Sequence, residues 1–332
     1  MKKSLLEEEL GKLIELEKYD FPGLGTKVVG EGNVTKICKT RDGNAIFLSH
    51  SDGNTVVYFP TKVKTVVRAF YNFMPASMPK KIKAVLMDLD GTSVHSEHFW
   101  IWVIERVTAR LLNDDSFRFT AEDLPYVSGY SVSEHLQYCI NKYCRNIEGA
   151  TLSKARAIYF DIVHTEMEKI MSNAEDAKTG AFVPSPYLKE FLLNLKSNGV
   201  KIGLVSSGLY EKAWPEIVAA FKNLGLGNPA EFYDAIVTAG FTVKKGHVGT
   251  LGELEPKPHP WLYAEVLFSL DVPAEEAVGI EDSGAGVLAI RAAGLPAIGI
   301  AGGNIESGGE RPLCTEYVND LRECWELIKD RI

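Results

Sequence analysis

Long hydrophobic runs are missing from this chain of 332 residues. No apolar stretch approaches the roughly 20 residues that a membrane-spanning helix needs. The opening segment, MKKSLLEEELGKLIELEKYD, is too acidic for a secretory signal, and its apolar spacing predicts an amphipathic helix over residues 1–20. We therefore expect no membrane partner.

Dense clusters of Lys and Arg are missing as well, and the formal net charge is −8. Nucleic acids and anionic membranes attract surfaces that concentrate positive charge. The charge distribution therefore argues against a nucleic-acid partner.

Cysteine is scarce, with five residues and no CxxC pair. A disulfide framework or a zinc site would need cysteines at characteristic spacings. We interpret the chain as a reduced, cytoplasmic protein with free thiols and no zinc site.

The composition is that of a globular protein, with 45% hydrophobic and 24% charged residues, and the length predicts two or three domains. Between about residues 26 and 65, short β-rich runs alternate with turn signals. Asp42-Gly43 and Asp52-Gly53 are typical hairpin turns, and Pro75 and Pro79 mark a join. Residues 1–80 are therefore predicted to form a small appended α+β domain, for which the sequence names no protein partner.

The rest of the chain predicts an α/β core with an insertion. Residues 95–180 show apolar positions at helical spacing and no clear strand, so they are expected to form an all-helical cap. Residues 81–94 and 181–332 alternate strands with helices, which is typical of a doubly wound parallel sheet covered by helices. The expected strands are 82–87, 200–205, 235–237, 278–280, 297–300 and 317–318.

Polar residues follow three of these strands at the point where each one ends. Asp88 and Asp90 follow the first, Ser206 and Ser207 the second, and Glu281 and Asp282 the strand 278–280. Lys257 precedes the helix that is expected to begin near residue 261. Ligands of doubly wound sheets bind beyond the carboxyl ends of the strands, so these side chains are expected to converge.

Each of these signals has an ordinary structural explanation when it is taken alone. Asp-x-Asp-Gly is a common turn, Ser-Ser-Gly often caps a helix, and a lysine between two prolines is usually a solvated loop residue. Glu281 and Asp282 could be acids favoured by the dipole of the helix that follows. Their coincidence at one edge of a single sheet favours a functional site.

The ordered motifs resemble those of the haloacid dehalogenase superfamily. They are Asp88-Leu89-Asp90-Gly91-Thr92, Ser206, Lys257 and Glu281-Asp282. The stretch GIEDSGAGVLAIRAAGLPAIGI resembles the β-phosphoglucomutase-like and sugar-phosphatase-like branch, in which a helical cap is inserted after the first motif. The resemblance covers residues 81–332 and implies a Rossmann-like core.

The resemblance also implies roles for the motif residues. Asp88 would be the nucleophile that forms an aspartyl-phosphate, and Asp90 the general acid and then the general base. Mg²⁺ would be held by the Asp88 carboxylate, the Asp90 carbonyl and Asp282, with Glu281 supporting the ion directly or through water.

The phosphoryl oxygens would be held by Lys257 and the Ser206 hydroxyl, together with backbone N–H groups near Ser207 and Gly91. One position departs from the family pattern, because Trp261 stands where relatives often carry an aspartate after the lysine motif.

The favoured hypothesis is a Mg²⁺-dependent phosphatase that hydrolyses a small phosphorylated, sugar-phosphate-like metabolite. A sugar-phosphate mutase on the same scaffold and a non-catalytic binding protein are the alternatives. A dehalogenase or phosphonate hydrolase is disfavoured, because those relatives usually lack the acid/base that Asp90 would supply.

The preference for a phosphatase over a mutase depends on the cap. Where the mutase relatives have an arginine after a Gly-x-Ser motif, Gly129-Tyr130-Ser131 is followed here by Val132. Valine cannot bind a second phosphate, although Lys142, Arg145 or Lys169 could replace the arginine. Because every motif residue follows position 87, residues 1–80 are expected to be dispensable for the chemistry.

Overall fold

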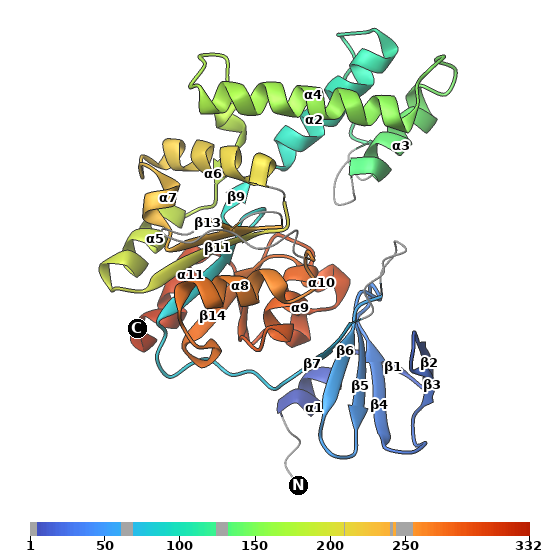
Figure 1. Cartoon of the computed structure of the whole chain (residues 1–332), viewed down its shortest axis with the longest axis vertical. Coiled ribbons are helices and arrows are strands. Elements are labelled where there is room, and N and C mark those ends of the chain that lie inside the picture. Colours follow the sequence, from blue (N-terminus) through green and yellow to red (C-terminus); the bar gives the residue numbers. More distant parts are fainter. Residues whose placement is uncertain (1–4, 61–68, 124–131, 209, 240–241, 244–254) are drawn as a thin grey trace. The chain divides into compact units, whose positions relative to one another are not determined.

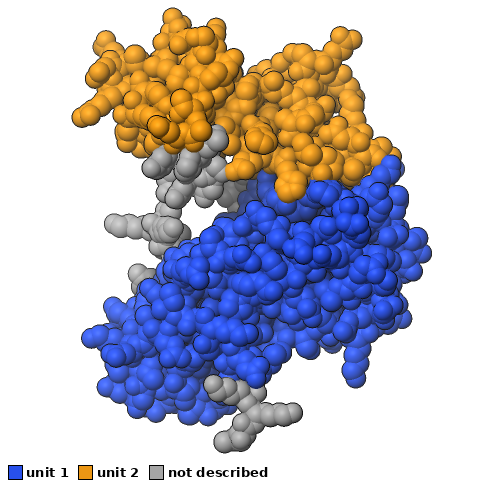
Figure 2. Space-filling model, turned by 180° about the vertical axis from the view of Figure 1, so that it is seen from behind, with its two compact units in different colours: residues 1–93, 185–210, 228–332 blue, residues 94–184, 211–227 orange. Residues whose placement is uncertain are grey.

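The computed structural model describes residues 5–60, 69–123, 132–208, 210–239, 242–243 and 255–332. The chain divides into two compact units, shown in Figure 2. Unit 1 comprises residues 1–93, 185–210 and 228–332, and unit 2 comprises residues 94–184 and 211–227. The predicted N-terminal segment and α/β core both fall in unit 1, and the three-domain division stays a prediction.

The centre of unit 1 is a seven-stranded sheet of order β13-β12-β11-β8-β14-β15-β16, in which β12 and β13 pair antiparallel and the other pairs are parallel. The predicted α/β fold is confirmed. The strands are β8 (Ala84–Asp88), β11 (Lys201–Ser206), β12 (Ala235–Thr238), β13 (Thr242–Val243), β14 (Ala277–Glu281), β15 (Ala297–Ile300) and β16 (Glu316–Val318).

Helices cover both faces of this sheet (Figure 1). On one face lie α8 (Trp261–Leu270) and α9 (Gly284–Ala292), and on the other α5 (Leu188–Ser197) and α11 (Leu321–Ile328). Every residue of β8, β12, β14 and β15 is buried, which explains why these strands appear in the sequence as continuous apolar runs.

Strand β8 lies at the point where the order of the sheet reverses. The chain builds outward from β8 to β11 and β12 on one side, and later to β14, β15 and β16 on the other. In sheets of this kind, ligands usually bind beyond the carboxyl ends of the strands at such a point.

The N-terminal part of unit 1 contains an antiparallel sheet of order β1-β4-β5-β6-β7. The two predicted Asp-Gly turns are confirmed, because they join β4 to β5 and β5 to β6, and both glycines have positive φ. A separate hairpin pairs β2 with β3. The strands are β1 (Ile14–Leu16), β2 (Lys18–Phe21), β3 (Gly25–Val28), β4 (Val34–Lys39), β5 (Ile46–His50), β6 (Thr55–Tyr58) and β7 (Phe70–Asn72).

The helix expected over residues 1–20 is wrong for most of its length. Helix α1 covers only Leu5–Leu10, and the chain then forms β1 and β2. Gly11 follows the helix directly, and glycine is a poor residue for helix interiors. Ile14–Leu16 instead pair with Ile37–Lys39 of β4, so tertiary pairing overrides a local pattern that suits a helix.

The N-terminal sheet and the central sheet share one hydrophobic cluster. Leu6, Leu10, Phe47 and Phe73 belong to the same buried cluster as Leu86 of β8. The guanidinium of Arg291 in α9 also donates to Glu9 of α1, which links the core to the N-terminal part of the chain. Residues 1–80 are thus packed onto the core within unit 1.

Unit 2 is mainly helical, with α2 (Glu97–Leu112), α3 (Val132–Tyr143), α4 (Leu152–Met171) and most of α6 (Tyr210–Leu224). The sequence did not predict the short antiparallel pair of β9 (Val94–His95) and β10 (Val183–Pro184) at its base. Within the part of the chain that the structure describes, no helix has the length and apolarity to cross a bilayer.

Candidate active site

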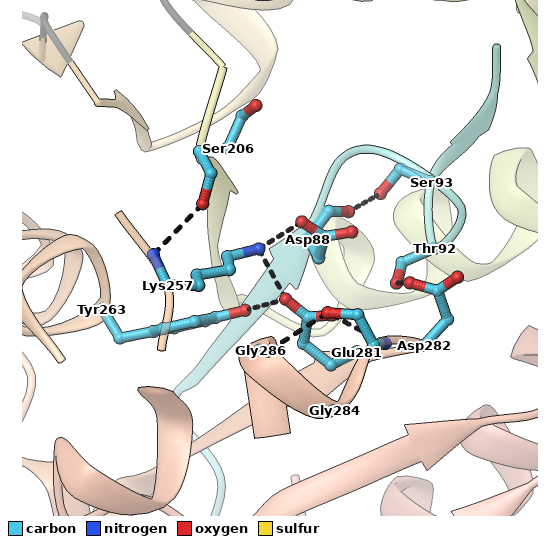
Figure 3. A network of polar contacts seen from close by, with 12 residues as sticks. Asp88, Thr92, Ser93, Ser206, Lys257, Tyr263, Glu281, Asp282, Gly284 and Gly286 are labelled. Atoms are coloured by element: carbon cyan, nitrogen blue, oxygen red, sulfur yellow. Dashed lines mark hydrogen bonds and ion pairs between the residues drawn. The ribbon is translucent and has the colours of Figure 1, made fainter. Parts of the chain in front are cut away.

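Three neighbouring strands end at one edge of the central sheet, and each ends in a polar residue. Asp88 closes β8, Ser206 closes β11 and Glu281 closes β14, and all three are at least 95% buried. Because the three strands are parallel, their last residues reach the same edge (Figure 3). The predicted convergence of these positions is therefore found in the structure.

Lys257 lies between two of these carboxylates. Its ammonium Nζ contacts Oδ1 of Asp88 and donates to Oε1 of Glu281 at 2.5 Å. The lysine side chain is only 7% exposed. Burial alone would lower the pKa of Lys257, but the charges of Asp88 and Glu281 outweigh it and raise that pKa, so the ammonium stays charged.

Glu281 has all its acceptor positions engaged by donors. Oε1 accepts from Lys257 and from the buried Tyr263 hydroxyl at 3.0 Å. Oε2 accepts from the Ser283 backbone N–H at 3.1 Å and from the Ser283 hydroxyl at 2.9 Å. Such a carboxylate is fixed in orientation, and it fixes the position of Lys257 in turn.

Asp282 completes a cluster of carboxylates. One oxygen from each of Asp88, Glu281 and Asp282 lies within 4.8 Å of the others. Burial and the Glu281 charge raise the pKa of Asp88, and the same two causes raise the pKa of Asp282 to about 7. Carboxylates crowded in this way repel one another, and a hard divalent cation would remove that repulsion. The residues present therefore fit a Mg²⁺ ion.

The loop after β8 is fitted closely around Asp282. Gly91 has a φ of +88°, and a Cβ on it would lie 2.2 Å from Oδ2 of Asp282. Thr92 donates its hydroxyl to Oδ1 of Asp282 at 3.3 Å. Only glycine satisfies both the backbone angle and the space at position 91.

Ser206 ends β11 and Ser207 follows it, and β11 pairs with the edge of β8 opposite to the one that pairs with β14. The Ser206 hydroxyl accepts from the Gly208 backbone N–H at 3.0 Å, and the Ser207 hydroxyl accepts from the Lys257 backbone N–H at 3.3 Å. The loop that carries Lys257 is thereby tied to the end of β11. Asp90 is half-buried and its charge contributes to the raised pKa of Asp88.

Sequence reasoning placed Ser283 in the Glu-Asp-Ser-Gly stretch at the start of a helix, but it missed Tyr263 and Gly286. Tyr263 and Ser283 bond Glu281, and Gly286 makes room for it, because a Cβ there would lie 1.9 Å from the Glu281 carboxylate. The helix N-cap that the sequence suggests for this stretch is found at Ser283, which accepts from the Gly286 N–H at 3.1 Å. No sequence signal links Tyr263 to Glu281. Lys244 and Lys245 stand shortly before Lys257 in the sequence and could be mistaken for the motif lysine, but they lie outside the described residues.

The chain is similar in sequence to known proteins. A family model for haloacid dehalogenase-like hydrolases matches residues 82–294. The chain is 26% identical over 259 residues to β-phosphoglucomutase of Bacillus subtilis. This match covers 75% of this chain and 98% of that protein. It is 25% identical over 250 residues to "Putative pyrophosphatase PpaX" of Caldanaerobacter subterraneus, covering 75% of this chain and 94% of that protein.

The fold is also found among solved structures. CbbY from Rhodobacter sphaeroides, solved in complex with phosphate, superposes with a TM-score of 0.51 at 20% sequence identity. The match covers 73% of this chain and 96% of CbbY. At that identity the likeness concerns the fold alone.

Proposed function

The chain belongs to the haloacid dehalogenase-like hydrolase family, and on this premise we propose that it is a Mg²⁺-dependent phosphatase acting on a small phosphorylated metabolite. The observation that carries the proposal is the buried contact of Asp88 with Lys257 inside a cluster of three carboxylates. A nucleophilic carboxylate next to a cation and a metal-binding cluster is the arrangement that phosphoryl transfer needs.

In the proposed reaction, a carboxylate oxygen of Asp88 attacks phosphorus, and the bond between phosphorus and the ester oxygen breaks. Asp90 gives its proton to the leaving oxygen. Asp90 then takes a proton from water as that water attacks the aspartyl-phosphate, and the reaction releases inorganic phosphate and restores Asp88.

The remaining residues position the phosphoryl group. Lys257 would pair with a phosphoryl oxygen, and the Ser206 and Ser207 region and the Gly91 N–H would supply further donors. Asp88, the Asp90 carbonyl and Asp282 would hold Mg²⁺, which supplies charge neutralisation when it is bound. Because donors already engage both oxygens of Glu281, we assign this residue to support of Lys257 and the cluster rather than to direct metal ligation.

A sugar-phosphate mutase is the second candidate, favoured by the similarity to β-phosphoglucomutase. A mutase needs cationic side chains in the cap for a second phosphate. Lys142 is held by Asp123 at 2.7 Å, and Lys169 by Glu166 at 3.1 Å and Asp176 at 2.8 Å. Residues 129–131 lie outside the described residues, so the Gly-x-Ser comparison stays a prediction. Lys142 and Lys169, two of the three cap residues that could replace the arginine, are thus paired with carboxylates of the cap. This pairing supports a phosphatase, because a mutase would need such cations for a second phosphate.

We also propose a cytoplasmic location. All five cysteines are free and buried, which suits a reducing compartment.

A screen of phosphorylated metabolites for phosphate release, with and without Mg²⁺, tests the proposed function. We expect release that requires Mg²⁺ and that Asp88→Asn reduces by roughly a thousandfold or more while the circular dichroism spectrum stays native. Near-normal turnover by folded Asp88→Asn would overturn the mechanism. Incubation with a hexose 1-phosphate and a trace of the matching bisphosphate separates the two candidates, because a mutase forms the 6-phosphate isomer faster than inorganic phosphate.

A further inference from the structure

A cavity of about 210 Å³ lies between the N-terminal sheet and the C-terminal part of the core, within unit 1. One wall contains Lys12, Lys39 at the end of β4, and Arg41 in the turn that follows. The other wall is the segment from Glu306 to Pro312, which begins in α10 (Ile305–Gly308). The catalytic residues proposed above do not line this groove.

The groove concentrates positive charge on a chain whose net charge is −8. Its lining includes the four cations Lys12, Lys39, Arg41 and Arg311, and Glu306 is its one acidic member among the described residues. Residues of like charge repel when they gather around one space, unless an anion is bound between them.

Two carboxylates close in sequence to the lining residues accept hydrogen bonds from other groups. Both oxygens of Glu9 accept from the guanidinium of Arg291, at 3.2 and 3.0 Å. Oδ1 of Asp42 accepts from the Thr40 hydroxyl at 2.7 Å and from the Asn44 N–H at 2.9 Å. Within the lining, four cationic side chains therefore stand against one acidic side chain.

The two walls are fastened to each other without a ligand. The Asp42 N–H donates to the Gly308 carbonyl at 3.0 Å, and Nη1 of Arg41 donates to the Glu306 carbonyl at 3.3 Å. Gly309 has a φ of +95°, and a Cβ on it would lie 2.8 Å from the Arg41 nitrogen. A groove that is formed in advance loses little entropy of its own when it binds.

We propose that this groove binds a small metabolite that carries a phosphate group, at a site separate from the Asp88 centre. The volume is below the roughly 300 Å³ at which pockets for larger ligands begin, so it suits a phosphate group with a short body. Arginine and lysine together are the side chains that pair with phosphate oxygens. Among the described residues of the lining, Glu306 is the one carboxylate.

Equilibrium dialysis of the whole 332-residue chain against labelled inorganic phosphate tests this proposal. We compare the wild type with Lys12→Gln/Lys39→Gln, which removes two groove charges. Lys18→Gln/Lys80→Gln is the matched control, because it removes two exposed lysines that lie outside the groove. We expect the groove variant to lose one of the bound phosphates, or to bind it at least roughly tenfold more weakly. The control should bind as the wild type does.

Lys257→Met separates the two sites, because the groove should still bind phosphate when the catalytic lysine is absent. If Lys257→Met folds poorly, the phosphate binding of Lys12→Gln/Lys39→Gln is still compared with that of Lys18→Gln/Lys80→Gln. That comparison alone tests whether the groove binds phosphate. Unchanged phosphate binding in the groove variant overturns the proposal, and so does equal loss in the control. Failure of the proposed phosphatase function would leave the groove phosphate in place, so the two proposals fail separately.

Discussion

The hydroxyl of Tyr71 in β7 lies 2.8 Å from Nδ1 of His259, two residues after Lys257. His259 is 6% exposed, and the ring of Phe59 packs edge-on against it. Burial lowers the pKa of His259, so the ring is neutral at neutral pH. Tyr71 and Phe59 of the N-terminal part of the chain therefore contact and support the loop that carries Lys257, the candidate phosphate-binding lysine.

Tyr71→Phe should lower phosphatase activity although Tyr71 lies outside the motifs. It removes one hydrogen bond, worth about 1 kcal/mol, from the loop that carries Lys257. We expect a roughly three- to tenfold loss in kcat/KM for a generic aryl phosphate, measured by steady-state kinetics. Tyr19→Phe, which removes a hydroxyl from β2, serves as the control. Equal kinetics for the two variants would show that the contact between Tyr71 and His259 does not help to position Lys257.

Mg²⁺ binding should weaken as the pH falls below about 7, because burial and Glu281 raise the pKa of Asp282 to about 7. Below that pH the carboxyl holds a proton that must leave before a cation can bind. The apparent affinity should fall about tenfold per pH unit below this point and level off above it. Titrating Mg²⁺ against the melting temperature at several pH values measures this dependence. Asp282→Asn should abolish the stabilisation by Mg²⁺, whereas a pH-independent affinity in the wild type would contradict the assignment of Asp282.

The ion pair between Glu9 and Arg291 should contribute strongly to stability. The guanidinium is fully buried, and besides Glu9 it donates to the carbonyls of Met74 at 2.9 Å and Leu313 at 2.6 Å. Glu9→Gln leaves a buried cation without a charged partner, which costs about 3 kcal/mol in the free energy of unfolding. Urea denaturation measures this loss. The control is Glu15→Gln, whose exposed pair with Lys36 should be worth less than about 1 kcal/mol.

Removal of residues 1–80 would be more disruptive than the sequence suggests. It would take away Glu9 and the Met74 carbonyl from Arg291, and Phe73 from the shared cluster. The sequence predicts that residues 1–80 are dispensable for the chemistry. From these contacts we instead expect a chain that begins near residue 80 to be unstable and to lose activity. Full solubility and activity of that chain would restore the original expectation.

The sequence predicted the central sheet and the positions at its active edge for one physical reason. Strands buried on both faces appear as apolar runs, and in a parallel sheet their carboxyl ends meet. Asp88, Ser206 and Glu281 could therefore be placed together although they are far apart in the chain. The structure confirms this placement, and the catalytic roles stay proposals.

The contacts that the sequence did not predict depend on tertiary packing. The pattern of Leu5 to Leu16 suits an amphipathic helix, and only the pairing of β1 with β4 turns its second half into a strand. Tyr263 reaches Glu281, and Tyr71 reaches His259, across separations of 18 and 188 residues. No local pattern encodes such partners, because they are brought together by the packing of separate elements.

The stability of unit 1 should fall as the pH rises toward 8, because of the buried Glu310. A Cβ on Gly284 or on Gly308 would lie 2.3 Å from Oε2 of Glu310, which shows how closely the carboxyl is enclosed. Burial, and next the neighbouring Asp42 charge, raise the pKa of Glu310 to about 8 from an ordinary value of 4.5. The folded protein therefore retains a proton between these two pH values that the unfolded chain releases.

Because the folded state binds more protons in this window, its stabilisation by Glu310 is complete below about pH 4.5 and is lost as the pH rises to about 8. Glu310→Gln keeps the shape of the side chain and cannot ionise. We expect the wild type to lose about 2–4 kcal/mol of unfolding free energy, relative to this variant, between pH 5 and pH 8. Urea denaturation at both pH values gives the difference, and Glu316→Gln on the exposed part of β16 is the control. If the wild type and Glu310→Gln change in parallel with pH, Glu310 is already ionised in the folded protein and the argument from its burial fails.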